Sequence, residues 1–297
     1  MPDLILRTPE ERFVGLPDFP WQPKYLEVKG VRMARIDEGP PEAPVALLLH
    51  GEPSWSFLYR KMIPGLLAGG MRVVAPDLVG FGRSDKPADP RAYTYQAHVD
   101  WLSGLIAALD LKSVMLFCQD WGGLLGLRIV GEQPERFARV CASNTGLPTG
   151  DQAMPGAFKV WRAFALYSPW FPIGRIVQSG VVRGMTPAVR DAYDAPFPSA
   201  KYQVAARAFP RLVPTTPDDP ASAPNRAAWE TLKKFDKPFL TLFGKNDPIT
   251  RGGNKYLQSL IPGCKDQPHE LIRGAGHFIQ EDAGPELTEA LLHWREG

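Results

Sequence analysis

Short runs of apolar residues recur along the chain, with helix-like segments between them. Nearly continuous apolar runs are typical of strands that are covered on both faces. The runs that we interpret as buried strands span residues 45–50, 71–77, 114–120, 139–145, 238–244 and 269–274. Segments with helical spacing separate the earlier runs and span residues 56–67, 95–109 and 123–132. This alternation predicts an α/β fold with a mostly parallel central sheet flanked by helices.

Two further runs, at residues 25–28 and 31–37, flank the pair Lys29-Gly30. Their spacing predicts an antiparallel hairpin at the sheet edge, with the glycine in the turn.

The strand pattern stops between about residues 146 and 229. This stretch is rich in Pro, Trp, Phe and Tyr, and its helix-like pieces lie near residues 158–166, 173–182, 187–192 and 201–208. The strand pattern resumes at residue 238. We therefore expect an α/β core made of residues 1–145 and 230–297, with residues 146–229 inserted as a helical lid, or cap, over the strand ends.

Composition excludes several classes of function. The 297 residues carry 34 basic and 32 acidic side chains, so no basic excess indicates nucleic-acid binding. The start of the sequence lacks an apolar stretch of signal-peptide length, and no run approaches the roughly 18 apolar residues of a membrane span. The three cysteines are far apart and form no disulfide framework. We expect a cytoplasmic protein with no membrane or nucleic-acid partner, no metal and no cofactor.

Polar residues follow four of the predicted strands. In open α/β sheets, active sites lie beyond the carboxyl ends of the strands. We therefore expect these four segments to meet: His50-Gly51-Glu52-Pro53, Asp120-Trp121-Gly122-Gly123, Asn246-Asp247-Pro248 and Gly276-His277-Phe278.

The segment around Asp120 has the layout of a nucleophile elbow, in which a sharp turn joins a strand to a helix. Small residues are usual two positions before and after the nucleophile, and here they are Cys118 and Gly122. The chain order of nucleophile, acid and histidine also matches, with Asp120, Asp247 and His277. The alternative is that Asp120 is only a helix cap, which leaves the matching Asp247 and His277 contexts unexplained.

The chain resembles the haloalkane dehalogenases of the α/β-hydrolase superfamily over nearly its whole length. Glu52 after His-Gly and the lid segment indicate the subgroup that holds halide with two tryptophans, whereas the other motifs are shared with epoxide hydrolases. The segments that carry the resemblance are HGEPSWSFLYR, DLVGFGRSDKP, CQDWGG, DAPFPSAKYQVAARAFPRLVP and GAGHFIQED.

The resemblance implies hydrolysis of a haloalkane to a primary alcohol, halide and a proton through an alkyl ester on Asp120. A carboxylate suits this attack because it is already ionised at neutral pH. His277 is the expected base that activates water, and Asp247 is expected to orient its imidazole. We expect the backbone N–H groups of Glu52 and Trp121 to form the oxyanion hole. For the Glu52 side chain, a place near the catalytic water and a purely structural role stay open.

The leaving halide needs donors in a dry pocket, and an indole N–H supplies one without adding charge. Trp121 is one expected donor. In the lid, the pair Phe158 and Trp161 matches the resembled subgroup, so we prefer Trp161 over Trp170, whose Ser-Pro-Trp-Phe-Pro setting indicates a packing corner. The expected substrate pocket consists of Phe158, Phe164, Leu124 and Phe278.

An epoxide hydrolase is the main rival interpretation, because it uses the same aspartate nucleophile. It needs acidic O–H donors from the lid, and Tyr167, Tyr193 and Tyr202 are available there. A non-catalytic relative that acts as a ligand receptor would be expected to lack a triad residue, and none is missing. The preferred haloalkane chain length and the preferred halogen stay open. The oligomeric state also stays open, with a slight preference for a monomer.

Overall fold

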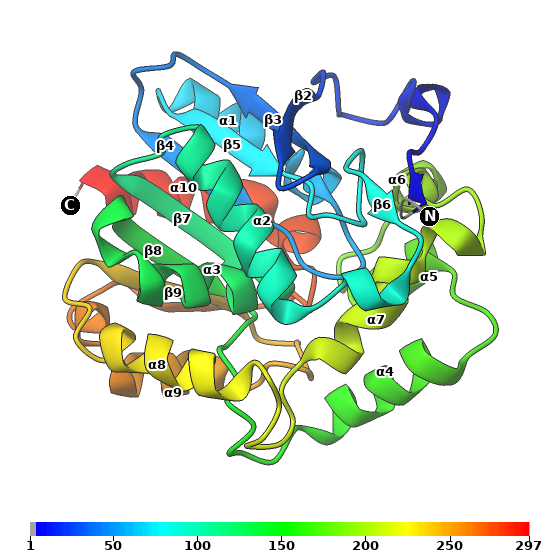
Figure 1. Ribbon diagram of the computed structural model, residues 1–297. Coiled ribbons are helices and arrows are strands. Elements are labelled where there is room, and N and C mark those ends of the chain that lie inside the picture. Colours follow the sequence, from blue (N-terminus) through cyan, green and yellow to red (C-terminus); the bar gives the residue numbers. More distant parts are fainter. Residues whose placement is uncertain (1–3, 297) are drawn as a thin grey trace.

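An eight-stranded sheet forms the centre of the structure, a computed structural model that describes residues 4–296 (Figure 1). Its strands are β2 (Lys24–Val28), β3 (Val31–Glu38), β4 (Val45–Leu49), β5 (Arg72–Pro76), β7 (Val114–Gln119), β8 (Phe137–Ser143), β9 (Phe239–Gly244) and β10 (Glu270–Ile272). They lie in the order β10-β9-β8-β7-β4-β5-β3-β2. Pairing is parallel from β5 to β10, and β3 is antiparallel to both β5 and β2.

The apolar runs form strands that are buried on both faces. Every residue of β4, β7 and β9 is buried. Figure 1 shows α2 (Tyr95–Ala108) and α3 (Trp121–Glu132) in front of the sheet and α10 (Ile279–Glu296) behind it, where α10 packs on α1 (Ile63–Ala68). The mostly parallel sheet with helices on both faces is therefore confirmed.

The edge hairpin is also confirmed. Val28 of β2 pairs with Val31 of β3, which leaves Lys29 and Gly30 as the two-residue turn. Both turn residues have positive φ, 47° and 80°, the conformation that such tight turns favour.

Four helices between β8 and β9 lie in the stretch that we propose as the cap. They are α4 (Gly156–Tyr167), α5 (Ile173–Ser179), α6 (Pro187–Asp194) and α7 (Val204–Leu212), and they lie together beside one end of the sheet (Figure 1). Within the cap, α4 packs on α7 and α5 packs on α6.

The expected cap boundary at residue 229 falls inside helix α8 (Ser222–Leu232), which packs on α3 of the core. Arg128 of α3 donates to Asn225 Oδ1 at 3.1 Å. At Gly131 a Cβ atom would lie 2.6 Å from Ala228 Cβ, so the two helices touch directly. We propose that the cap ends before Ser222.

The continuous helix expected over residues 56–67 is wrong. The structure has a 3₁₀ turn at Ser56–Tyr59 and then a separate helix, α1. Pro64 lacks the N–H that a continuous helix would donate to the carbonyl four residues earlier, so it is placed in the first turn of a new helix that begins at Ile63. Ser56 N–H instead donates to Asp77 Oδ1 at 2.8 Å, which fixes the turn against the sheet.

Five helices and strands were missed. Strand β1 (Ile5–Leu6) pairs with β6 (Lys86–Pro87) in a ladder too short to leave a periodic pattern. Helix α9 (Gly253–Leu260) follows β9, and helices α8 and α10 were not predicted either. Among residues 4–296, no helix is long and apolar enough to cross a membrane.

Candidate active site

Asp120 occupies the turn between β7 and α3 in an unusual backbone conformation. Its φ is 50° and its ψ is −123°, and its side chain makes no capping hydrogen bond to α3. Positive φ is uncommon for residues other than glycine and clusters at functional turns. The helix-cap interpretation of Asp120 is therefore wrong, because its carboxylate makes no hydrogen bond to the first turn of α3.

Glycines let two segments, one at residues 49–51 and one at Thr145, approach this turn closely. A Cβ atom at Gly122 would lie 2.0 Å from the backbone oxygen of Leu49, and one at Gly51 would lie 2.4 Å from Asp120 Cβ. One at Gly123 would lie 2.0 Å from Thr145 Oγ1. Side chains at these positions would push apart the loops that meet at Asp120.

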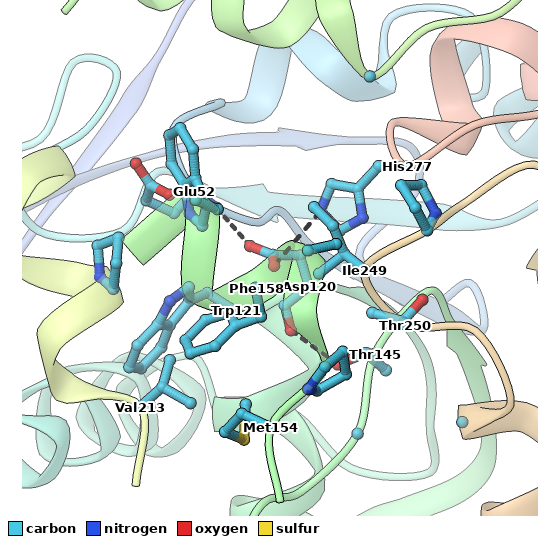
Figure 2. A pocket seen from close by; sticks show the side chains of 18 of the residues that line it. Glu52, Asp120, Trp121, Thr145, Met154, Phe158, Val213, Ile249, Thr250 and His277 are labelled. Atoms are coloured by element: carbon cyan, nitrogen blue, oxygen red, sulfur yellow. Dashed lines mark hydrogen bonds and ion pairs between the residues drawn. The ribbon is translucent and has the colours of Figure 1, made fainter. Parts of the chain in front are cut away.

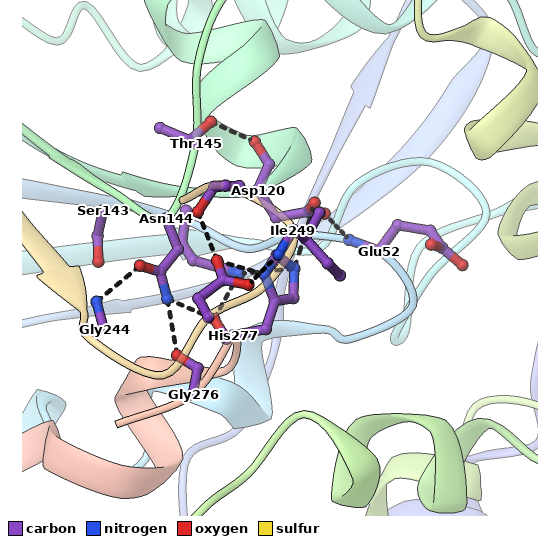
Figure 3. A network of polar contacts seen from close by, with 12 residues as sticks. Glu52, Asp120, Ser143, Asn144, Thr145, Gly244, Ile249, Gly276 and His277 are labelled. Carbon is purple, nitrogen blue, oxygen red and sulfur yellow. Dashed lines mark hydrogen bonds and ion pairs between the residues drawn. The ribbon is translucent and has the colours of Figure 1, made fainter. Parts of the chain in front are cut away.

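The structure brings Asp120, His277 and Asp247 together, and Figure 3 shows the His277 ring beside Asp120. His277 Nε2 lies 3.4 Å from Asp120 Oδ2, and His277 Nδ1 lies 3.0 Å from Asp247 Oδ2. Asp247 also accepts hydrogen bonds from Ile249 N at 2.8 Å and from the Thr250 hydroxyl. The histidine is thus held between two carboxylates, each from a different strand end.

The two neighbouring carboxylates raise the pKa of His277. Burial alone lowers the pKa of His277, but the charge of Asp247 and the hydrogen bonds to Asp120 and Asp247 outweigh it and raise the pKa to about 10. Burial raises the pKa of Asp247, yet the neighbouring His277 and the bonds from Thr250 and Ile249 bring it below its ordinary value. The lowered pKa of Asp247 and the raised pKa of His277 thus both favour a charged pair of carboxylate and imidazolium.

The backbone and the side chain of Glu52 have different surroundings. Its backbone N–H donates to Asp120 Oδ1 at 2.8 Å. Its side chain is buried and points away from that bond (Figure 3), and within residues 4–296 no hydrogen-bond partner reaches its Oε1. Burial, helped by the charge of Asp120, raises the pKa of the Glu52 carboxyl well above its ordinary value.

An apolar cavity of about 1010 Å³ opens above these residues (Figure 2). Trp121 lies beside Asp120, packed against Tyr95 and Phe209 with ring centroids 5.4 and 4.5 Å away. As the first residue of α3, Trp121 also has a backbone N–H without an acceptor in its own helix. All residues that we expected in the pocket line this cavity, namely Phe158, Phe164, Leu124, Phe278, Trp121 and Trp161.

The two candidate lid tryptophans differ in their surroundings. Trp161 is partly buried and packs with Phe164 and Phe171, each 5.9 Å away between ring centroids. Trp170 also lines the cavity, but 61% of it is exposed. The expectation that Trp170 is a packing corner is wrong, because its ring lies on the surface beside Arg175.

Asn144, which the sequence did not single out, connects all three catalytic loops. Its backbone oxygen accepts from Asp120 N at 3.1 Å. Its side chain accepts from Gly244 N at 2.8 Å and donates to the carbonyls of Gly276 and His277 at 2.8 and 2.9 Å (Figure 3). The only available signal was its position at the polar end of a buried strand.

Two other buried histidines, His50 and His98, have structural surroundings. His50 accepts from Leu78 N at 3.0 Å and contacts Gly51 O, and His98 is buried against Tyr93 and Phe209. Within residues 4–296, no group of three His, Cys, Asp or Glu side chains could hold a metal ion.

Comparison with known proteins agrees with this geometry. A family described as alpha/beta hydrolase fold matches residues 44–284. Haloalkane dehalogenases of Psychrobacter cryohalolentis and Mycobacterium marinum are 54% and 52% identical to this chain. The matches cover 98% of this chain, and 97% and 99% of those proteins, respectively.

A solved structure is similar over the same length. The haloalkane dehalogenase DpaA from Paraglaciecola agarilytica, described as tetrameric, has a TM-score of 0.91 at 38% identity, covering 99% of this chain and 98% of that one. The chain therefore belongs to the haloalkane dehalogenases of the α/β-hydrolase fold and is a hydrolase of carbon–halogen bonds.

Proposed function

We propose that the reaction proceeds through an alkyl ester on Asp120. The observation that supports this most is the contact of His277 with both Asp120 and Asp247 at the floor of an apolar cavity. The bond from Glu52 N–H occupies Asp120 Oδ1, which leaves Oδ2 to attack the halogen-bearing carbon. The new C–O bond forms as the carbon–halogen bond breaks, and the halide leaves with the electron pair.

Ester formation also switches His277 into a base. Alkylation removes the negative charge of Asp120, which is one of the causes that raise the pKa of His277. The imidazolium then loses its proton more easily, and neutral His277 takes a proton from water as the water attacks the ester carbonyl. Asp247 stabilises the imidazolium that forms, and the primary alcohol leaves as Asp120 is regenerated.

Two backbone donors are suited to stabilise the oxyanion of this second step. Glu52 N–H already contacts Asp120 Oδ1, the oxygen on which the negative charge develops. Trp121 N–H, at the start of α3, is the proposed second donor, and the helix dipole favours negative charge at this end.

We assign the halide to the indole N–H groups of Trp121 and Trp161. Both side chains line the cavity, and an indole donates without adding a charge that would compete with Asp120. The protein would thus belong to the subgroup that holds halide with two tryptophans. The geometry favours Trp161 because the exposed ring of Trp170 leaves an anion in contact with water.

The apolar cavity suits haloalkanes, with water and halide as the other small molecules that enter and leave. The three cysteines are free and buried, which fits our proposal of a reducing, cytoplasmic location. The slight preference for a monomer stays a prediction.

The lid tyrosines give no support to the epoxide hydrolase alternative. Tyr167, Tyr193 and Tyr202 are absent from the residues that line the cavity. The Tyr193 hydroxyl instead donates to Glu281 in the core. No tyrosine of this set is therefore placed to protonate an epoxide ring above Asp120.

A panel of short bromoalkanes, chloroalkanes and matching epoxides tests the proposed function. We expect continuous halide release from the bromoalkanes and no diol from the epoxides. Diol formation without halide release would contradict the proposal and favour the rival.

A further inference from the structure

Two adjacent buried carboxylates at the start of α10, Glu281 and Asp282, bind the cap to the core in different ways. Glu281 forms an ion pair with Arg60 of the core and accepts from the Tyr193 hydroxyl of α6. Asp282 accepts from backbone N–H groups of the cap and also from the turn that carries His277. The proposed mechanism uses neither residue.

Asp282 is shared between two segments that are about 100 residues apart. Its Oδ1 accepts from Val182 N at 3.0 Å and from Arg183 N at 2.6 Å, both in the cap segment 180–183 that follows α5. Its Oδ2 accepts from Gly276 N at 2.8 Å, directly before His277, and from Val182 N at 3.1 Å. Three N–H groups therefore share the two oxygens, with Val182 N near both, and the side chain is buried.

The same two segments also touch without the help of Asp282. Phe278 N donates to Gly180 O at 3.3 Å, and a Cβ atom at Gly276 would lie 2.3 Å from the same oxygen. A Cβ atom at Gly180 would lie 3.4 Å from His277 Cβ. The histidine turn and the cap segment thus lie against each other along several residues.

The cap segment is at the same time part of the cavity wall. Gly180 lines the cavity, as do Ile176 and Ser179 of α5. A movement of this wall would therefore be transmitted through Asp282 and Gly276 to the imidazole beside Asp120.

We propose that Asp282 is a positioning residue that fastens the cap segment 180–183 to the turn carrying His277, so that activation of water depends on it while attack by Asp120 does not. This inference rests on the proposed function. Asp120 is held by Asn144 and Glu52, neither of which contacts Asp282. His277 lies on a turn with two anchors. Asp282 accepts from Gly276 N, and Asn144 donates to the carbonyls of Gly276 and His277.

The variant Asp282→Asn tests the proposal with little change in size. An amide has one acceptor oxygen, so its NH₂ group must face N–H donors on one of the two sides. We expect the release of the first equivalent of halide to stay within about twofold of wild type. Steady-state turnover should fall roughly 10- to 100-fold, since small misplacements of a catalytic group cost about that much. Mass spectrometry of acid-quenched samples should then show the alkyl ester on Asp120 as the main enzyme species.

Tyr193→Phe is the matched control. It removes one buried bond between cap and core but none to the histidine turn, and it preserves the Arg60–Glu281 pair. We expect a lower thermal midpoint without accumulation of the ester. Equal accumulation in both variants would attribute the effect to general loosening of the cap and overturn the proposal. An equal slowing of both steps in Asp282→Asn would overturn it as well.

Two further measurements separate the possible failures. Should Asp282→Asn lack the native circular dichroism spectrum, the same comparison is made with Asp282→Glu, which retains the charge but displaces the two oxygens. Wild-type enzyme that releases no halide from bromoalkanes would contradict the proposed function. Wild-type enzyme that releases halide beside an Asp282 variant that accumulates no ester would contradict the positioning role alone.

Discussion

The core wall of the cavity is fixed by hydrogen bonds, whereas the cap wall is built from apolar side chains that are partly open to solvent. On the core side, the side chains of Asp247 and His277 are 1% and 6% exposed, and each has a buried partner. On the cap side, Val160 and Trp170 are 72% and 61% exposed, and the aromatic cluster around Trp161 relies on ring contacts.

From this difference we infer that the core wall determines the rate of the reaction and the cap wall determines which substrate binds. Catalytic groups need to be held within fractions of an ångström, which buried polar networks achieve. Apolar side chains without directional bonds can adjust to substrates of different shape. We expect substitutions on the core wall to change rate constants and those on the cap wall to change which haloalkane or halide binds.

The largest effect is expected at the nucleophile. Asp120→Ala should lower turnover about 10⁴-fold or more, because no other group is placed to attack carbon. Halide release with enzyme in excess over substrate measures the loss. Residual activity close to wild type would show that the core wall does not supply the nucleophile.

Replacing His277 should slow the second step of the reaction but not the first. His277→Gln is expected to lower steady-state turnover roughly 10²- to 10⁴-fold, the usual range for loss of a general base. The first halide is still released, because attack on carbon does not need the base. Mass spectrometry after exposure to a bromoalkane should find the ester on Asp120, and its absence would count against the two-step scheme.

A pair of glycine substitutions compares the rigidity of the two walls. In Gly122→Ala the new methyl group would lie 2.0 Å from Leu49 O, so we expect a loss of roughly 1–3 kcal/mol in the free energy of unfolding. Gly156 begins cap helix α4, and a Cβ atom at this position would meet no neighbouring residue of the described chain within 4 Å. Gly156→Ala should be neutral or gain up to about 1 kcal/mol. Urea denaturation checks both, and equal losses would remove the contrast.

On the cap wall, Trp161→Phe should weaken halide binding about tenfold, since a hydrogen bond to an ion contributes about 1.5 kcal/mol or more. Trp170→Phe should change it less than about twofold, because that ring is already exposed to water. Halide inhibition of turnover, together with halide quenching of tryptophan fluorescence, gives the affinities. Equal effects would overturn the choice of Trp161.

A further effect concerns pH and stability. The pKa of His277 is raised from 6.5 to about 10 in the folded protein. Its contribution to stability is therefore complete below pH 6.5 and is lost as the pH rises toward 10. Urea denaturation at several pH values should show a steeper decline in this interval for wild type than for His277→Gln. Parallel curves would mean that the histidine is not held by its two carboxylates.

The sheet and the meeting of Asp120, Asp247 and His277 at one end of it were predictable because their signals are local. Continuous apolar runs marked β4, β7 and β9, and each of these three residues follows a strand or a turn near its end. Asn144 and Asp282 escaped prediction because each acts through bonds to backbone groups about 100 residues away, which leave no local pattern.

The cap was predictable as an insertion but not in its details. Helix α8 was not predicted, and it packs on α3 of the core across the expected cap boundary. Likewise, the prolines around Trp170 indicated a turn, but not that the ring would be turned toward solvent.

The most direct test of the covalent scheme is a single turnover in water labelled with ¹⁸O, with enzyme in excess over 1-bromohexane. Attack by Asp120 predicts that the alcohol carries an unlabelled oxygen from the carboxylate. The label should instead appear in the peptide that contains Asp120, as measured by mass spectrometry. Labelled alcohol and an unlabelled Asp120 peptide would mean that water displaces the halide directly, which would contradict the account.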